Sequence, residues 1–276
     1  MFRVTKVLNH NALLAVDSSD QKEYLIMGRG VGFGKKVSER LELPSDCTVY
    51  SLQTRGKNES AKDIVHSMNP VFLEIAGSVL NQAENTFGKI DRNILFPMAD
   101  HIAYAVKRMK NGEQISNPLT SDIRMLFYKE YKVAECVKPI LKTLCDVDIS
   151  DDEVGYVALH VHSAISDEKV SNAMQMAAAV RQCVAAIEEE VGVAMDVQSF
   201  GYNRLMNHIK FMAARLAVGE KLKVDMNSYI AHNFPKSFEI AKDVCQGLAK
   251  NLKTELPESE IGYLAMHIER VYSEKA

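Results

Sequence analysis

The feature that most constrains this sequence is a pattern that occurs twice, 107 residues apart. The stretch HIAYAVKRMKNGE starts at His101, and HIKFMAARLAVGE starts at His208. A second pair has the same separation: EVGYVALH ends at His160, and EIGYLAMH ends at His267. No gap is needed to align the two copies. Such linked matches indicate a tandem duplication of one domain of roughly 100 residues.

Both copies have the apolar spacing of helices. The stretches NPVFLEIAGSVLNQAENTFG, DHIAYAVKRM, SDIRMLFYKEYKVAECVKPILKTL and DEVGYVALHVHSAI place apolar residues every three or four positions. A further stretch, SNAMQMAAAVRQCVAAIEEEVG, is rich in Ala, Met and Glu, which favour helices. We therefore predict two tandem all-α helical-bundle domains, at residues 67–170 and 171–276.

The N-terminal residues follow a different pattern. The runs RVTKVLNHNALLAVD and KEYLIMGRGVGFGKK are short, apolar or β-branched, and joined by the turn signal SSDQ. The run LELPSDCTVYSLQ adds another strand after a proline turn. The pattern predicts a small all-β domain at residues 1–56, a sheet of about four antiparallel strands. A polar linker is expected at residues 57–66.

Composition excludes several classes of protein. The chain is 47% hydrophobic and 25% charged, as in soluble globular proteins, and its net charge of −3 gives no strong field toward nucleic acid or membrane. No apolar run approaches the roughly 20 residues that span a bilayer, and the start MFRVTKVLNHN lacks the apolar region of a signal peptide. The five cysteines include no C-x-x-C pair, which favours reduced thiols. We expect a cytoplasmic protein without membrane insertion.

The paired histidines are the first candidate sites: His101, His160, His208 and His267. A lone histidine is usually a packed or surface residue, but here both histidines persist in both copies. A metal site needs three or four ligands, and His162 would point away from His160 on a helix, so we expect no metal and no cofactor. A neutral imidazole is a nucleophile that can accept a phosphoryl group. The added charge of about −1.5 to −2 could then switch packing.

An arginine follows the first histidine of each copy by seven residues, at Arg108 and Arg215. Seven residues are close to two helical turns, so each arginine shares the face of its histidine. A solvated arginine, or one paired with Glu153 or Glu260, is the simpler interpretation. A phosphate-reading role stays open.

The segment GRGVGFGKK, residues 28–36, is the other candidate site. It is not a P-loop, because Lys36 stands where Ser or Thr is required, and its glycine spacing does not fit a dinucleotide loop. A glycine-rich turn between strands is the simple interpretation. Glycines also let a ligand approach the backbone closely, and Arg29, Phe33 and Lys35 offer cations and a stacking ring, which suits RNA. Residues 1–56 carry eight Lys and Arg against six Asp and Glu, whereas the remainder carries 25 against 30.

These stretches resemble the bacterial transcriptional antiterminators that the sugar phosphotransferase system (PTS) regulates. KVLNHNALLAVD and MGRGVGFGKK resemble the N-terminal co-antiterminator RNA-binding domain of that family. ADHIAYAVKRMKNGEQISNPL, EVGYVALHVHSA, LMNHIKF and EIGYLAMHIERV resemble its two PTS regulation domains. The resemblance covers essentially the whole chain in the usual domain order. It is closest to the glucose-operon members, while the aryl-β-glucoside and sucrose members stay open.

The resemblance implies an RNA-binding homodimer. Its N-terminal domain would bind a hairpin in the leader mRNA that overlaps a terminator, so that transcription continues. The RNA contacts of the family fall on Lys6, Asn9, Asn11, Gly28, Arg29, Gly30 and Phe33. His10 stands where the family often has Asn. The phosphorylated histidines of the family fall on His101, His160, His208 and His267.

The resemblance also implies the partners and signs of control. The sugar permease (enzyme II) would phosphorylate the first regulation domain and inhibit, and the carrier phosphoprotein HPr would phosphorylate the second and favour activity. The glucose-operon members depend little on the second input. Such a regulator is not an enzyme.

Two other classes of protein are weighed against this interpretation. A DNA-binding activator could use the same regulation domains, but it would carry a helix-turn-helix, and residues 1–54 look like strands. An enzyme could use the histidines with a metal or phosphate, but no carboxylate–histidine constellation with metal spacing is present.

Overall fold

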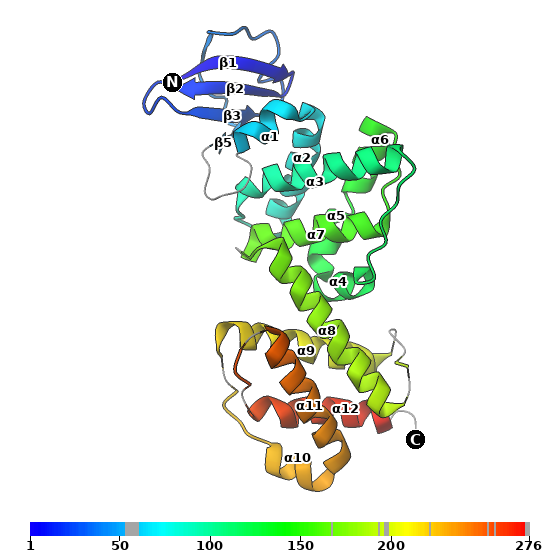
Figure 1. Ribbon diagram of the computed structural model, residues 1–276. Coiled ribbons are helices and arrows are strands. Elements are labelled where there is room, and N and C mark those ends of the chain that lie inside the picture. Colours follow the sequence, from blue (N-terminus) through cyan, green and yellow to red (C-terminus); the bar gives the residue numbers. More distant parts are fainter. Residues whose placement is uncertain are drawn as a thin grey trace. The chain divides into compact units, whose positions relative to one another are not determined.

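The computed structural model describes residues 1–52, 61–166, 168–192, 194–195, 199–220, 222–252, 254–256 and 258–273. Its N-terminal part is one antiparallel sheet with the strand order β4-β1-β2-β3-β5 (Figure 1). The strands are β1 Phe2–Asn9, β2 Ala12–Asp17, β3 Glu23–Met27, β4 Arg40–Leu41 and β5 Thr48–Ser51. The predicted class, a small sheet followed by helices, is confirmed. The sheet has five strands instead of about four, because the two-residue strand β4 pairs with the start of β1.

The sheet is buried on both faces. One face carries the cluster of Val4, Leu13, Ala15, Ile26, Val31 and Leu41. On the other face, Leu14, Leu25 and Tyr50 lie opposite one another on neighbouring strands and are buried. The Tyr50 ring meets Phe96 edge-on at 6.0 Å between centroids, so this face packs against helices. Burial on both faces explains why β2 is a continuous apolar run rather than an alternating one.

The first compact unit contains residues 1–117 and 129–170, and so joins the sheet to a group of helices (Figure 1). These are α1 Ala61–Ser67, α2 Pro70–Phe87, η1 Arg92–Ile94, α3 Leu95–Lys110, α5 Tyr128–Ala134, α6 Val137–Cys145 and α7 Asp151–Ser166. Asn69 caps α2 by accepting a hydrogen bond from the Val71 N–H, and Pro70 fits the first turn. Of the predicted linker at 57–66, residues 57–60 lie outside the described residues and the rest forms most of α1.

The second compact unit contains residues 118–128 and 171–276. Its helices are α4 Thr120–Leu126, α8 Val170–Val191, α9 Phe200–Val218, α10 Asn227–Asn233, α11 Pro235–Leu252 and α12 Ser259–Ser273. Helix α4 lies within the range predicted for the first regulation domain, yet it packs with α9: the Lys210 ammonium donates a hydrogen bond to the Leu126 carbonyl.

The duplication is visible in the helix ends. Helices α3 and α9 are each followed within two residues by a glycine with positive φ, Gly112 at 78° and Gly219 at 70°. After each glycine, the N–H of a glutamate bonds back to the carbonyl of Arg108 or Arg215, at 3.0 Å in both copies. The repeated Gly-Glu is therefore a left-handed helix terminus, which glycine adopts without steric cost.

The two copies differ where α11 is one helix and its counterpart is two. Residues 128–145 correspond to 235–252, but they break into α5 and α6 between Ala134 and Val137. Pro139 has no N–H to donate to the carbonyl four residues earlier, at Glu135, and its ring crowds that carbonyl. The counterpart of Pro139 is Gln246, so α11 continues.

Three further observations bear on function. None of the helices in the described part of the chain is long and apolar enough to cross a membrane. All five cysteines are free thiols. Among the described residues, no group of three or more His, Cys, Asp or Glu side chains is arranged to hold a metal ion.

Candidate functional site

The glycine-rich segment after β3 folds back over the turn between β1 and β2. The Gly32 N–H donates to the His10 carbonyl at 2.9 Å, and the Gly30 N–H donates to Asn11 Oδ1 at 2.9 Å. Gly30 has a φ of 69°, and a Cβ at Gly32 would lie 2.1 Å from the Asn9 carbonyl oxygen. Glycine is therefore required at both positions, once for backbone conformation and once for space.

This fold brings six of the seven predicted RNA contacts together. We call them the glycine edge: Asn9, Asn11, Gly28, Arg29, Gly30 and Phe33. The Asn11 N–H donates to Asn9 Oδ1 at 2.9 Å, and the Gly28 N–H donates to the Asn11 carbonyl at 3.0 Å. Arg29 lines the same pocket as Asn11. The seventh residue, Lys6, is exposed on β1, three residues before Asn9.

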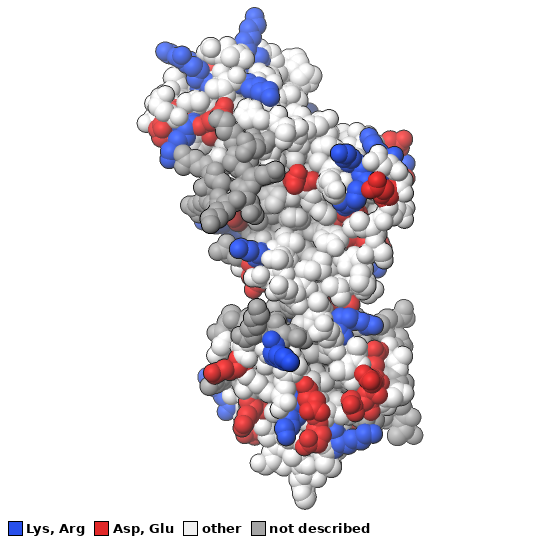
Figure 2. Space-filling model, viewed as in Figure 1, with Lys and Arg blue, Asp and Glu red and all other residues white. Residues whose placement is uncertain are grey.

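The glycine edge presents a stacking ring and a guanidinium group to solvent. The Phe33 side chain is 70% exposed, although its ring meets His10 edge-on at 5.3 Å between centroids. His10 thus supports the Phe33 ring from the side. On the face drawn in Figure 2, Lys and Arg side chains stand out on the N-terminal part of the chain. Exposed rings and guanidinium groups of this kind stack on unpaired bases.

Four residues of the first repeat, one of them a buried glutamate, lie close together. We call them the first histidine cluster: His101 and Arg108 on α3, and Glu153 and His160 on α7. The Glu153 side chain is 2% exposed, and Arg108 Nη2 donates to its Oε1 at 2.6 Å. His101 Nε2 lies 3.1 Å from Glu153 Oε2 without the alignment of a hydrogen bond. The His101 and His160 rings are 5.6 Å apart between centroids.

The second repeat builds the same arrangement, the second histidine cluster of His208, Arg215, Glu260 and His267. Arg215 donates two hydrogen bonds to Glu260, at 2.7 and 2.9 Å, and the Glu260 side chain is fully buried. The His208 and His267 rings are 4.7 Å apart between centroids. Of the two simple interpretations of these arginines, solvated or paired with a glutamate, the structure shows the pairing in both copies.

Burial sets the protonation of the clusters. It lowers the pKa of His160 to about 3, assisted by the nearby His101. It also lowers the pKa of His208 to about 3, with smaller contributions from His267 and Arg215. Burial works to raise the pKa of Glu153, but His101 and Arg108 outweigh it, and the net pKa is lowered. Near pH 7 each cluster therefore combines neutral imidazole with, in the first repeat, an ionised carboxylate.

Comparison with known families accounts for both parts of the chain. A model described as the CAT RNA binding domain matches residues 2–59, and a model described as the PRD domain matches residues 77–164 and 181–271. The chain belongs to the CAT–PRD family of antiterminators. A CAT–PRD antiterminator is a regulatory protein that binds RNA under the control of its PRD domains, and is not an enzyme.

Relatives of this CAT–PRD protein match it along nearly its whole length. It is similar to "Protein GlcT" of Staphylococcus saprophyticus, with 28% identity over 97% of this chain and 96% of the relative. It is also similar to the "GlcA/glcB genes antiterminator" of Staphylococcus carnosus, with 27% identity over 96% of this chain and 94% of the relative. A solved structure, the "Crystal structure of GlcT CAT-PRDI", aligns with a TM-score of 0.51 and 28% identity, covering 60% of this chain and 98% of that one.

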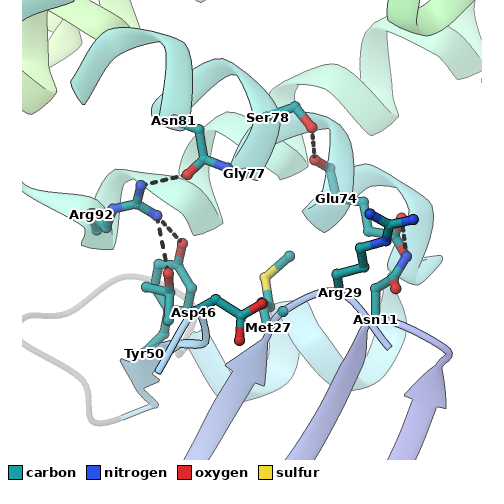
Figure 3. Close-up of a pocket in the computed structure, with 12 residues that line it drawn as sticks. Asn11, Met27, Arg29, Asp46, Tyr50, Glu74, Gly77, Ser78, Asn81 and Arg92 are labelled. Carbon is teal, nitrogen blue, oxygen red and sulfur yellow. Dashed lines mark hydrogen bonds between the residues drawn. The ribbon is translucent and has the colours of Figure 1, made fainter. Parts of the chain in front are cut away.

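Sequence reasoning missed Arg92, which ties the CAT sheet to the first repeat. Its guanidinium donates to Tyr50 Oη at 3.2 Å and to Thr48 Oγ1 at 3.4 Å, both on β5. It also donates to Glu84 at 2.7 Å and to Asn81 at 2.5 Å, both on α2. Figure 3 shows the bond to Asn81. No periodicity or motif marks Arg92, because its partners on β5 lie more than 40 residues earlier in the chain.

Sequence reasoning also gave no role to His162. Its Nδ1 lies 3.1 Å from Glu130 Oε1, which links α7 to α5. At the corresponding positions of the second repeat, Ser237 donates to Glu269 at 2.7 Å and links α11 to α12. The acidic partner has changed helices between the copies while the link is kept. His162 is thus a structural contact, which explains why it has no histidine counterpart.

Proposed function

We propose that this chain acts as a homodimer that binds a hairpin in the leader mRNA of a sugar-utilisation operon and so prevents an overlapping terminator from forming. The observation that carries the proposal is the glycine edge, where a 70% exposed Phe33, a guanidinium and the Asn9 and Asn11 amides meet on a CAT domain. The proposed domain boundaries are residues 1–56, 67–170 and 171–276. Among the described residues, the N-terminal part contains strands and no helix-turn-helix, so a DNA-binding activator has less support.

The two histidine clusters are the proposed inputs. A phosphorylated PTS protein would give up its phosphoryl group: the bond between phosphorus and the donor side chain breaks with its electron pair left on the donor, as the lone pair of a neutral imidazole nitrogen bonds to phosphorus. The proton on the other ring nitrogen passes to the donor or to solvent. The permease would modify His101 and His160, and HPr would modify His208 and His267. In the first cluster the phosphoryl group would arrive beside the ionised Glu153 carboxylate, 3.1 Å from His101. Repulsion between the two anions, and competition for Arg108, would then change the packing of α3 on α7.

Glucose is the proposed sugar, because the relatives carry names linked to glc genes. Leaders of aryl-β-glucoside and sucrose operons serve as competing targets. For each candidate sugar, a different permease would phosphorylate the same histidines, and the sequence of the bound RNA would determine which operon is controlled.

The test is direct RNA binding by the purified full chain. We expect it to retain a leader hairpin on a filter and to retain much less of a duplex DNA of the same sequence, at one fixed salt concentration. A variant with Phe33→Ala should bind roughly 5- to 150-fold more weakly, if the ring stacks on a base. Val37→Ala is the matched control, because Val37 is also an exposed apolar residue of the same loop region. Equal binding of RNA and DNA would contradict the proposal.

A further inference from the structure

The glycine edge is in contact with the first repeat through one carboxylate. Glu74, on α2, accepts a hydrogen bond from Asn9 Nδ2 at 2.5 Å and another from Asn11 Nδ2 at 3.3 Å. Both asparagine side chains also have their oxygens engaged, with the Asn11 N–H and the Gly30 N–H. Each of the two amide groups that an RNA would contact therefore donates to Glu74 in this state of the protein.

Glu74 reaches the edge across an open pocket of about 350 Å³ (Figure 3). Asn11, Gly28 and Arg29 line it from the glycine edge, and Glu74, Gly77 and Ser78 line it from α2. A carboxylate offers two anionic oxygens as hydrogen-bond acceptors, and phosphate oxygens and base edges offer acceptors to the same donors. The same polar groups could therefore meet either α2 or RNA, but not both at once.

From this geometry we infer that the Glu74 face of α2 is an intramolecular competitor of RNA, and that it covers the asparagines of the glycine edge until RNA displaces it. The inference rests on the proposed function, because it takes Asn9 and Asn11 as RNA contacts. What it adds is a specific surface of the first repeat, the Glu74 face of α2, that opposes RNA binding.

Other contacts hold α2 in place over the edge. Arg92 joins β5 to α2 through Tyr50 and Glu84, as described above. On the same side of the sheet, a Cβ at Gly77 would lie 3.5 Å from the Met27 methyl carbon, so the helix approaches the strand closely. These contacts do not involve the glycine edge itself. Helix α2 is thus held beside the proposed RNA contacts, and its Glu74 side chain is the group that reaches them.

The position of α2 also suggests how the first repeat could act on RNA binding. Helix α2 packs on α3, which carries His101 and Arg108 of the first histidine cluster. A change in the packing of α3 would shift the helix that carries Glu74. Phosphorylation of the first histidine cluster would then change how strongly Glu74 competes with RNA, in addition to any change in dimerisation.

The experiment compares RNA binding by full-length variants, with the leader hairpin used for the wild type as the probe. Glu74→Ala removes both acceptors, and we expect it to bind roughly tenfold tighter than wild type. Glu74→Gln keeps the size of the side chain, so it reports on the contact even if Glu74→Ala folds poorly, and it should gain less. Asp46→Asn is the matched control: Asp46 is an exposed carboxylate that lines the same pocket, so its removal takes away an equal charge.

The outcomes separate the two proposals. A gain in Glu74→Ala with Asp46→Asn within about twofold of wild type supports the inference. An equal gain in both variants means that any lost negative charge helps RNA to bind, and overturns it. Wild-type binding without a gain in either Glu74 variant also overturns it, while leaving the proposed function intact. If no variant binds any leader RNA, the proposed function fails and the inference fails with it.

Discussion

Glu153 is the residue on which the first histidine cluster depends, because its carboxylate is buried, is paired with Arg108 and lies beside His101. Removing Arg108 would leave this charge without its strongest partner. We predict that Arg108→Ala lowers the free energy of unfolding by about 3 kcal/mol, as expected for a broken buried pair. Lys107→Ala, an exposed neighbour on the same helix, should change it by less than about 0.5 kcal/mol. Urea unfolding of the two variants checks this, and equal midpoints would contradict the pairing.

Buried histidines make the stability of the protein depend on pH. The pKa of His160 is about 3 in the folded chain, against 6.5 as its ordinary value. Between these pH values the unfolded chain binds a proton at His160 that the folded chain does not. The stabilising contribution of the neutral His160 is therefore fully present above pH 6.5 and is lost as the pH falls toward 3. For His160→Asn we predict that the stability depends less steeply on pH in this range, by about 1.4 kcal/mol per pH unit, which is the contribution of His160.

Urea midpoints at pH 6.5, 5.5 and 4.5 give the measurement for His160→Asn. His232→Asn removes an exposed histidine of α10 and should keep the wild-type slope. If both variants show the wild-type slope, then His160 does not stay neutral in the folded chain.

At the scale of the helices, glycines have opposite effects according to their backbone conformation. Gly219 ends α9 with a φ of 70°, where an alanine is strained. Gly247 lies inside α11, and a Cβ built there meets nothing within 4 Å. We predict that Gly219→Ala costs about 1 kcal/mol of stability and that Gly247→Ala adds about 0.5–1 kcal/mol. Thermal unfolding should separate them in opposite directions, and shifts of the same sign would argue against the left-handed terminus.

The helices and strands could be predicted from the sequence, because the spacing of apolar residues is a local property of the chain. The spacing identified the amphipathic helices, and the alternation of turns and β-branched runs identified the sheet. The break between α5 and α6 follows from Pro139, which a closer inspection of the sequence could have found. The two-residue strand β4 could not be predicted, because so short an edge depends on its pairing with β1.

At the scale of the whole chain, the duplication was the strongest signal, and it led to both histidine clusters. The offset of 107 residues pairs each arginine with its counterpart, and the structure adds the glutamate bonds. The contacts of Glu74 and Arg92 could not be predicted in this way. They join the sheet to the helices, and the positions 107 residues later hold Arg181 and Ser199, so comparison of the two copies gives no sign of them.

The two repeats should respond in opposite directions to added charge. We predict that His101→Asp or His160→Asp lowers readthrough and loosens the dimer, because a two-fold dimer places every added charge twice. Alanine at both positions should be active with or without sugar, whereas His208→Asp or His267→Asp should keep or raise activity. A reporter behind the leader terminator and dimer mass from light scattering provide the readouts. Equal behaviour of the Asp and Ala variants in the first repeat would show that charge is not the switch.

The central claim is that this CAT–PRD protein prevents termination through its glycine edge. Transcription in vitro through a glucose-operon leader, with purified polymerase and increasing amounts of the unmodified full chain, tests it most directly. The account predicts that full-length transcript rises with protein concentration, that Val37→Ala behaves as wild type, and that Phe33→Ala restores termination. Readthrough that does not change with wild-type protein on any sugar-operon leader, or that is the same with Phe33→Ala, would contradict it.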